Sequence, residues 1–218
     1  MPKQFDLIVF DWDGTLMDSA GVIAASIRGA CRDLGLTEPS EPAARHIIGL
    51  GLNEAIAHLL PELPLVDYPC LIERYRHHYL GKDENIPLFA GAERVVRNLH
   101  GASFLLGVAT GKSRRGLDRA LEHTGLRAYF HGTRCADECF SKPHPEMLEQ
   151  LMDTLGTSRE RTLMVGDTSH DLLMARNAGV PALAVSYGAH PRADLLAYAP
   201  NACVDSIAEM EAWLLANA

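Results

Sequence analysis

The sequence lacks an excess of positive charge. Its 218 residues include 20 Lys and Arg against 28 Asp and Glu, which gives a formal net charge of -8. A protein that coats nucleic-acid phosphates needs the opposite sign, so we exclude that class and expect no nucleic-acid partner. Long apolar runs are also missing, since no segment approaches the roughly 18 apolar residues of a membrane-spanning helix. We therefore expect no membrane partner.

Cysteine is scarce as well, with five residues in the chain. The odd number, in a chain this long, favours reduced thiols over a disulfide framework. Cys135 and Cys139 have a spacing that zinc ligands can have, but no second pair reinforces them, so a zinc site has little support. The N-terminal segment is interrupted by Asp6, Asp11 and Asp13, which does not suit a signal peptide, and we expect a cytoplasmic protein.

What the sequence does contain is a series of short apolar runs that alternate with helical patterns. Runs typical of buried strands lie at residues 7–10, 104–109, 162–165 and 182–185, with a weaker candidate near Tyr129 and Phe130. Two of the helical patterns stop at Gly125 and Gly156, as helix C-termini prefer. This alternation predicts an α/β fold with a Rossmann-like, mostly parallel sheet that helices cover on both faces.

Residues 17–85 break the alternation. They contain helical patterns around residues 22–34, 52–60 and 68–80 and no convincing strand. The chain would return to the sheet through residues 86–92, where Pro87 and Gly91 suit a hinge. We therefore predict two domains. An α/β core would comprise residues 1–16 and 86–218, and an inserted all-helical cap would comprise residues 17–85.

Two of the expected strands are followed by pairs of aspartates. Asp11 comes directly after the run at 7–10, and Asp13 lies two residues further, where side chains of an extended segment point the same way. Asp167 and Asp171 follow the run at 162–165. One aspartate at a strand end is often a turn former or a helix N-cap. Four of them at the edge where parallel sheets bind ligands indicate a metal or catalytic site, and Mg²⁺ would relieve the repulsion between neighbouring carboxylates.

Two further segments contain groups that suit a phosphate. Thr110 ends the second apolar run, and its hydroxyl and the amides of Gly111 and Lys112 precede a helical pattern. Such an arrangement can bind phosphate oxygens, although alone it could be only a helix cap. Lys142 precedes a stiff Pro-His-Pro segment that gives its side chain a defined direction, whereas a lone lysine usually lies on the surface.

The segments "DWDGTL", the apolar strand that ends in Thr110, "KPHPE" and "GDTSHD" together resemble the four motifs of the haloacid dehalogenase-like superfamily. The resemblance covers nearly the whole chain in order and spacing, including a helical insertion after the first motif. It implies that Asp11 is a nucleophile that forms an aspartyl-phosphate, and that Asp13 acts as general acid and then as general base.

The same resemblance implies a metal site and a phosphate site. Mg²⁺ would be held by the Asp11 carboxylate, the backbone carbonyl of Asp13 and Asp167, with Asp171 as a further ligand or as a partner of one. Thr110 and Lys142 would bind the oxygens of the transferring phosphoryl group, together with the amide of Gly111.

The implied activity is that of a Mg²⁺-dependent phosphatase acting on a small phosphorylated metabolite, with phosphoglycolate among the candidates. Asp13 argues against a dehalogenase, because members that cleave carbon-halogen bonds lack this aspartate. The insertion resembles the cap of the subfamily that contains phosphoglycolate phosphatase and beta-phosphoglucomutase. Arg45 and His46 would then contact an anionic leaving group, unless they form a solvated helix end. Many phosphoglycolate phosphatase-like members have Asn where this chain has Gly111, which leaves the substrate open.

Several alternatives stay open. A phosphomutase shares the core residues, and a non-catalytic protein that binds a phosphorylated ligand is conceivable. A bacterial receiver domain also combines an Asp, Mg²⁺, a Thr or Ser and a Lys, but it is shorter and lacks both the insertion and an acid at the position of Asp13. The basic stretch that includes Arg74, Arg76 and Lys82 is either a solvated helix face or a surface that steers an anionic substrate. Monomer and homodimer are both compatible with the sequence.

Overall fold

The computed structural model describes residues 3–82 and 85–217. A parallel sheet of six strands runs through the core in the order β3-β2-β1-β4-β5-β6. The strands are β1 (Leu7–Phe10), β2 (Leu105–Thr110), β3 (Gly132–Cys135), β4 (Thr162–Gly166), β5 (Ala182–Val185) and β6 (Ala202–Val204). Because β1 lies in the middle, Phe10 is paired with Val108 of β2 and with Val165 of β4. The α/β fold predicted from the sequence is confirmed.

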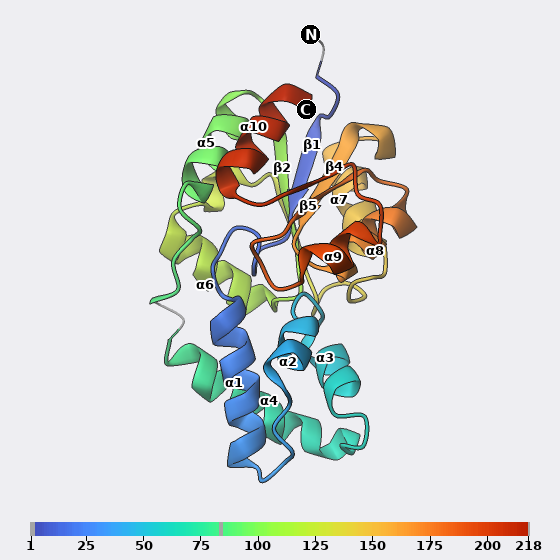
Figure 1. Cartoon of the computed structure of the whole chain (residues 1–218). Helices are drawn as coiled ribbons and strands as arrows, with labels where there is room; N and C mark the ends of the chain where they lie inside the picture. The colour runs from blue at the N-terminus through green and yellow to red at the C-terminus, as the bar shows by residue number, and fades with distance from the viewer. Residues whose placement is uncertain (1–2, 83–84, 218) are drawn as a thin grey trace.

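Helices cover both faces of this sheet (Figure 1). They are α5 (Ala92–Gly101), α6 (Arg114–Thr124), α7 (Glu146–Leu155), α8 (Ser169–Ala178), α9 (Arg192–Leu196) and α10 (Ile207–Asn217). Alternate strand residues serve opposite faces. Ile8 and Phe10 belong to the cluster that includes residues of α5, α6 and α10, whereas Leu7 and Val9 belong to the cluster with residues of α7, α8 and α9. The uninterrupted apolar run of β1 therefore reflects burial on both sides.

Four of the helices between β1 and β2 lie together at one end of the molecule (Figure 1). They are α1 (Ala20–Asp33), α2 (Glu41–His46), α3 (Leu52–Leu59) and α4 (Tyr68–Leu80). They share a small apolar core of their own, to which Ile27, Ile56 and Leu71 contribute. The predicted helical insertion is thus confirmed, and we call it the cap.

The two segments that join the cap to the core run side by side. The amide of Asp18 donates to the carbonyl of Pro87 at 3.0 Å, and the amide of Phe89 donates to the carbonyl of Leu16 at 2.9 Å. Such a paired, two-stranded connection suits a hinge. The division of the domains at residues 16–17 and 85–86 stays a prediction.

The prediction of a strand near Tyr129 and Phe130 is wrong in position. Tyr129 ends the short helix η3 (Arg127–Tyr129), and the strand begins at Gly132. Two further 3-10 helices in the described part of the chain are η1 (Leu65–Asp67) and η4 (Arg159–Arg161). The sequence prediction failed here because β3 is an edge strand in which only Cys135 is buried. None of the described helices is both long and apolar enough to cross a membrane.

Candidate active site

The carboxyl ends of the central strands bring polar side chains to one buried spot. Asp11 follows β1, Thr110 ends β2 and Asp167 follows β4, and each of these residues is 0% exposed. Parallel strands have all their carboxyl ends at the same edge of the sheet, which is why residues far apart in the sequence meet here. A buried polar group costs free energy unless it has a hydrogen-bond or charge partner. The partners of these side chains therefore determine the chemistry that the site allows.

Asp11, Asp167 and Asp171 form a buried cluster of acids. Each offers a carboxylate oxygen, and these oxygens lie within 4.8 Å of one another. The ammonium of Lys142 lies among them, where it donates to Asp11 Oδ1 at 2.7 Å and to Asp171 Oδ1 at 2.6 Å. Burial alone would lower the pKa of Lys142, but the charges of Asp11 and Asp171 raise it above its ordinary value, so the lysine is charged.

The single ammonium leaves the cluster with an excess of negative charge. Burial, with a further contribution from the Asp171 charge, raises the pKa of Asp167 to about 7. Burial also raises the pKa of Asp11, although the Lys142 charge opposes this shift. Asp11 Oδ2 is buried and accepts no hydrogen bond from any described residue. Three carboxylates and an unpartnered buried oxygen fit a divalent metal ion, whose positive charge would compensate for both.

Two donors hold the Asp167 carboxylate in place. The hydroxyl of Thr15 donates to Oδ1 at 2.7 Å, and the amide of Ala189 donates to Oδ2 at 2.7 Å. The backbone of Gly188 passes so close that a Cβ at this residue would lie 2.2 Å from Asp167 Oδ2. Sequence reasoning missed Ala189 and Gly188 altogether, because they lie 22 and 21 positions away from Asp167 in the chain and follow a different strand.

Asp171 serves the helix and the site at once. Its Oδ2 accepts from the amide of Thr168 at 3.0 Å and from the Thr168 hydroxyl at 2.7 Å, which forms a capping box at the start of α8. Its Oδ1 accepts from Lys142. The sequence left open whether this aspartate caps a helix or belongs to the site. One carboxylate can serve both roles, because each of its oxygens faces a different partner.

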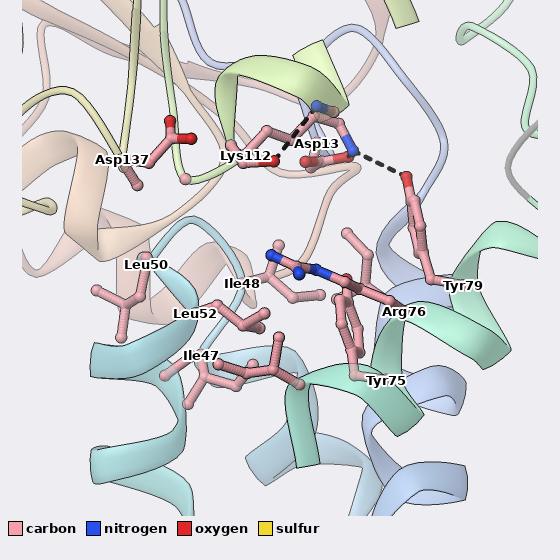
Figure 2. Close-up of a pocket in the computed structure, with 18 of the residues that line it drawn as sticks. Asp13, Ile47, Ile48, Leu50, Leu52, Tyr75, Arg76, Tyr79, Lys112 and Asp137 are labelled. Carbon is pink, nitrogen blue, oxygen red and sulfur yellow. Dashed lines mark hydrogen bonds and ion pairs between the residues drawn. The ribbon is translucent and has the colours of Figure 1, made fainter. Parts of the chain in front are cut away.

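Asp13 lies apart from this cluster and faces the cap. Its Oδ1 accepts from the Ser19 hydroxyl at 2.6 Å and lies 2.9 Å from the ammonium of Lys112. Lys112 also donates to the Tyr79 hydroxyl at 2.8 Å, and Figure 2 shows Tyr79 reaching from α4 toward this pair. The sequence had suggested only the amide of Lys112 as a binding group. The contact of its side chain with Asp13 could not be read from the spacing. The metal contact expected for the Asp13 carbonyl stays a prediction.

Of the remaining predicted residues, Thr110 and Gly111 lie beside Lys112, whereas Arg45 lies elsewhere. The hydroxyl of Thr110 accepts from the Lys112 amide at 3.2 Å, next to Gly111. Arg45 lies elsewhere, since it pairs with Glu41 at 3.1 Å, one turn earlier on α2, and lines a separate hollow beside His190. The structure therefore does not bring Arg45 together with the other predicted site residues, and its contact with a substrate stays a prediction without support from its position.

A cavity of about 510 Å³ separates the core from the cap, and Asp13, Gly111 and Lys112 form its core side. Figure 2 shows the cap side, where Ile47, Ile48, Leu50 and Leu52 face Arg76 and Tyr75 of α4. Cavities of this size are typical of small-molecule sites. Of the four predicted site aspartates, only Asp13 lines this cavity, whose far wall belongs to the cap.

Residues 8–185 match the family of haloacid dehalogenase-like hydrolases. The match covers most of the chain and includes the strands that carry the acids, and the chain belongs to this family. A solved structure of a haloacid dehalogenase-like hydrolase from Streptococcus pneumoniae superimposes with a TM-score of 0.82 at 26% identity, over 96% of this chain and 98% of that one.

Two relatives specify the type of hydrolase. The probable phosphatase IndB of Dickeya dadantii is 36% identical over 210 residues, which cover 94% of this chain and 91% of the relative. A phosphoglycolate phosphatase of Agrobacterium fabrum is 31% identical over 211 residues, which cover 94% of this chain and 90% of the relative. The protein is thus an enzyme of the phosphatase type within this family.

Proposed function

We propose that the protein is a Mg²⁺-dependent phosphatase that hydrolyses a small phosphorylated metabolite through an aspartyl-phosphate on Asp11. The observation that supports this proposal is the arrangement of contacts around the Asp11 carboxylate. Its carboxylate is buried at the carboxyl edge of the sheet, one oxygen is held by Lys142, and the other accepts no hydrogen bond from a described residue. A side chain that only stabilised the fold would have both oxygens paired.

The bond changes involve two aspartates. The Asp11 carboxylate attacks phosphorus while the bond to the leaving oxygen breaks, and Asp13 gives its proton to that oxygen. Asp13 then accepts a proton from a water molecule that attacks the same phosphorus. The bond between phosphorus and Asp11 breaks, and phosphate and the free carboxylate result. Ser19 and Lys112 orient the Asp13 carboxylate toward the cavity from which the substrate enters.

The other predicted residues bind the phosphoryl group and compensate its negative charge. Asp11, Asp167, the Asp13 carbonyl and Asp171, as a ligand or as a partner of one, would hold Mg²⁺, which would supply positive charge next to the phosphoryl oxygens. Lys142, Thr110 and the Gly111 amide bind those oxygens, whose negative charge must be offset in the transition state. Lys142 suits this task because Asp11 and Asp171 fix its ammonium from two sides.

The test compares phosphate release by the native protein and by Asp11→Asn, with Mg²⁺ or with a chelator. The substrates are an aryl phosphate and a panel of phosphorylated metabolites. Phosphoglycolate comes first in the panel because the A. fabrum relative is a phosphatase for it. A matched control is Asp118→Asn, which changes an acid of α6 that pairs with Arg127.

We expect release that needs Mg²⁺, disappears in Asp11→Asn and persists in Asp118→Asn. Identification of the products separates hydrolysis from a phosphomutase reaction, which would return a rearranged phosphoester in place of phosphate. If the folded protein binds Mg²⁺ and releases phosphate from no phosphomonoester, the proposal is overturned.

A further inference from the structure

The cavity beside Asp13 is larger than a two-carbon leaving group requires. Its volume is about 510 Å³. Glycolate has five non-hydrogen atoms and would fill roughly 150 Å³ even if each atom occupied as much volume as a water molecule, about 30 Å³. The buried residues Asp11, Thr110 and Lys142 do not line this cavity, so the phosphoryl group occupies little of it. Most of the space is therefore available to the part of the substrate that leaves.

Much of the cavity wall is apolar. It is lined by Ile23 and Ile27 of α1, Ile48 just before α3, Leu52 of α3 and Tyr75 of α4. A cavity with such walls gains free energy by burying apolar groups of a ligand, since their transfer from water is favourable. A leaving group that was polar throughout would lose hydrogen bonds to water without replacing them.

A cation extends into the same space. Figure 2 shows the guanidinium of Arg76 projecting from α4 between Asp13 and Lys112 on the core side and Ile48 and Leu52 on the cap side. Within residues 3–82 and 85–217, Arg76 forms no hydrogen bond and no ion pair. Besides Asp13, which pairs with Lys112, the carboxylates of Glu54 and Asp137 line the cavity, and none of the three forms an ion pair with Arg76.

Arg76 and Arg115, which both line the cavity, have no acid partner among the described residues, whereas many other arginines of the chain do. Arg32 pairs with Glu38 at 2.8 Å, Arg114 pairs with Glu138 at 2.7 Å, and each therefore has its charge compensated within the protein. An arginine offers several donors in a planar group that matches carboxylate and phosphate oxygens. Arg76 holds such a group in the cavity with no protein acid paired to it among the described residues.

We propose that the substrate is a phosphomonoester whose leaving alcohol has an apolar body and ends in an anionic group, and that Arg76 binds this anion. The inference rests on the proposed phosphatase function, because it places the phosphoryl group at Asp11. We infer the apolar body of the leaving group from the apolar wall, and its size from the volume of the cavity. We infer the negative charge at its far end from the position of Arg76. Glycolate has the charge but lacks the apolar body.

The test uses substrates that differ only at the far end. The pair consists of 4-(carboxymethyl)phenyl phosphate and 4-ethylphenyl phosphate, which have similar leaving groups at the reacting oxygen. The variants are Arg76→Ala and Arg76→Glu. The control is Arg74→Ala, which removes a neighbouring arginine of α4 that does not line the cavity.

We expect the native enzyme to prefer the carboxylate substrate. In Arg76→Ala, kcat/KM for that substrate falls about 10- to 100-fold, the range for a lost charged hydrogen-bonding contact, while 4-ethylphenyl phosphate is affected less than about threefold. Arg76→Glu reverses the preference toward the cationic 4-(2-aminoethyl)phenyl phosphate, a gain that damage to the fold could not produce. Arg74→Ala retains the native preference.

Binding separates this inference from the phosphatase proposal. The dissociation constants of benzylphosphonate and its 4-carboxymethyl derivative, which cannot be hydrolysed, are compared by calorimetry for the native protein and Arg76→Ala. Tighter binding of the derivative that is lost in Arg76→Ala supports the role of Arg76 even if no ester is hydrolysed. If 4-ethylphenyl phosphate is hydrolysed but the carboxylate gives no advantage in rate or binding, or if the advantage survives in Arg76→Ala, the inference is overturned and the phosphatase proposal stands.

Discussion

The backbone of Gly49 in the cap lies directly against Gly111 in the core. A Cβ at residue 111 would lie 2.6 Å from the Gly49 carbonyl oxygen and 2.5 Å from that of Leu50, distances that real side chains do not show. The amide of Gly51 donates to the Ser141 hydroxyl at 2.7 Å, which fixes the same loop to the core at a second point. The absence of a side chain at Gly111 thus lets the cap loop approach the core.

Gly111→Ala is expected to hold the cap loop away from the core. Because the closest atoms belong to backbone rather than to a flexible side chain, the loop must move, and kcat/KM falls about tenfold or more. The midpoint of thermal unfolding changes little, since the core itself is not altered. The control is Gly101→Ala, where a Cβ would meet nothing within 4 Å. Native kinetics in Gly111→Ala would show that this contact has no part in turnover.

Much of the fold could be predicted because the central strands are buried on both faces. The apolar runs at residues 7–10 and 182–185 coincide with β1 and β5. The edge strands gave no such signal. β3 has the sequence Gly-Thr-Arg-Cys, and β6 is three residues long with one buried side chain, Val204. Their position depends on pairing with a neighbour, which a single sequence does not reveal.

The sequence predicts which site residues meet where they follow the ends of neighbouring strands. It does not predict contacts that depend on the direction of a side chain. Asp11 and Asp167 could be expected to meet because both follow central parallel strands. The pairing of Lys112 with Asp13 requires the turn after β2 to direct that side chain toward the segment that follows β1. The substrate contact of Arg45 stays a prediction, and the helical spacing of α2 places its side chain beside Glu41.

Lys142→Met is expected to destabilise the metal-free protein. It leaves the carboxylates of Asp11 and Asp171 buried without their cation, and loss of one partner of a buried ion pair costs about 3–5 kcal/mol. Urea unfolding in the presence of a chelator measures the effect. The double variant Lys142→Met with Asp171→Asn recovers part of the loss, because it removes one of the two charges. An unchanged unfolding midpoint for Lys142→Met would contradict this account of the cluster.

Mg²⁺ binding is expected to weaken below pH 7. The pKa of Asp167 is raised to about 7 by burial, so the metal-free folded protein retains a proton there that the unfolded chain has lost. This proton favours the folded state at low pH, and the stabilisation disappears as pH rises through about 7. Mg²⁺ must displace the proton, so its apparent Kd rises about tenfold per pH unit below that value. Calorimetric titrations at about pH 6 and pH 8 check this, and equal affinities would contradict it.

Lys112→Met is expected to impair Asp13 without affecting Asp11. Loss of the ion pair lowers kcat/KM about tenfold for 4-ethylphenyl phosphate, whose leaving oxygen needs a proton. The loss is smaller for 4-nitrophenyl phosphate, whose leaving group departs without one. Tyr79→Phe removes one acceptor of Lys112 and has a weaker effect in the same direction, with Tyr68→Phe on the same helix as control. Equal losses for both substrates would show that Lys112 does not act through Asp13.

The central claim is that Asp11 carries the phosphoryl group, and chemical trapping tests it most directly. The protein is mixed with 4-nitrophenyl phosphate and Mg²⁺, quenched, and treated with borohydride, which reduces an aspartyl-phosphate to homoserine. Peptide mass spectrometry then locates the modified residue. We predict homoserine at residue 11, only when both substrate and Mg²⁺ are present. Phosphate release accompanied by homoserine at another aspartate, or by none in a rapidly quenched sample, would contradict the proposed mechanism.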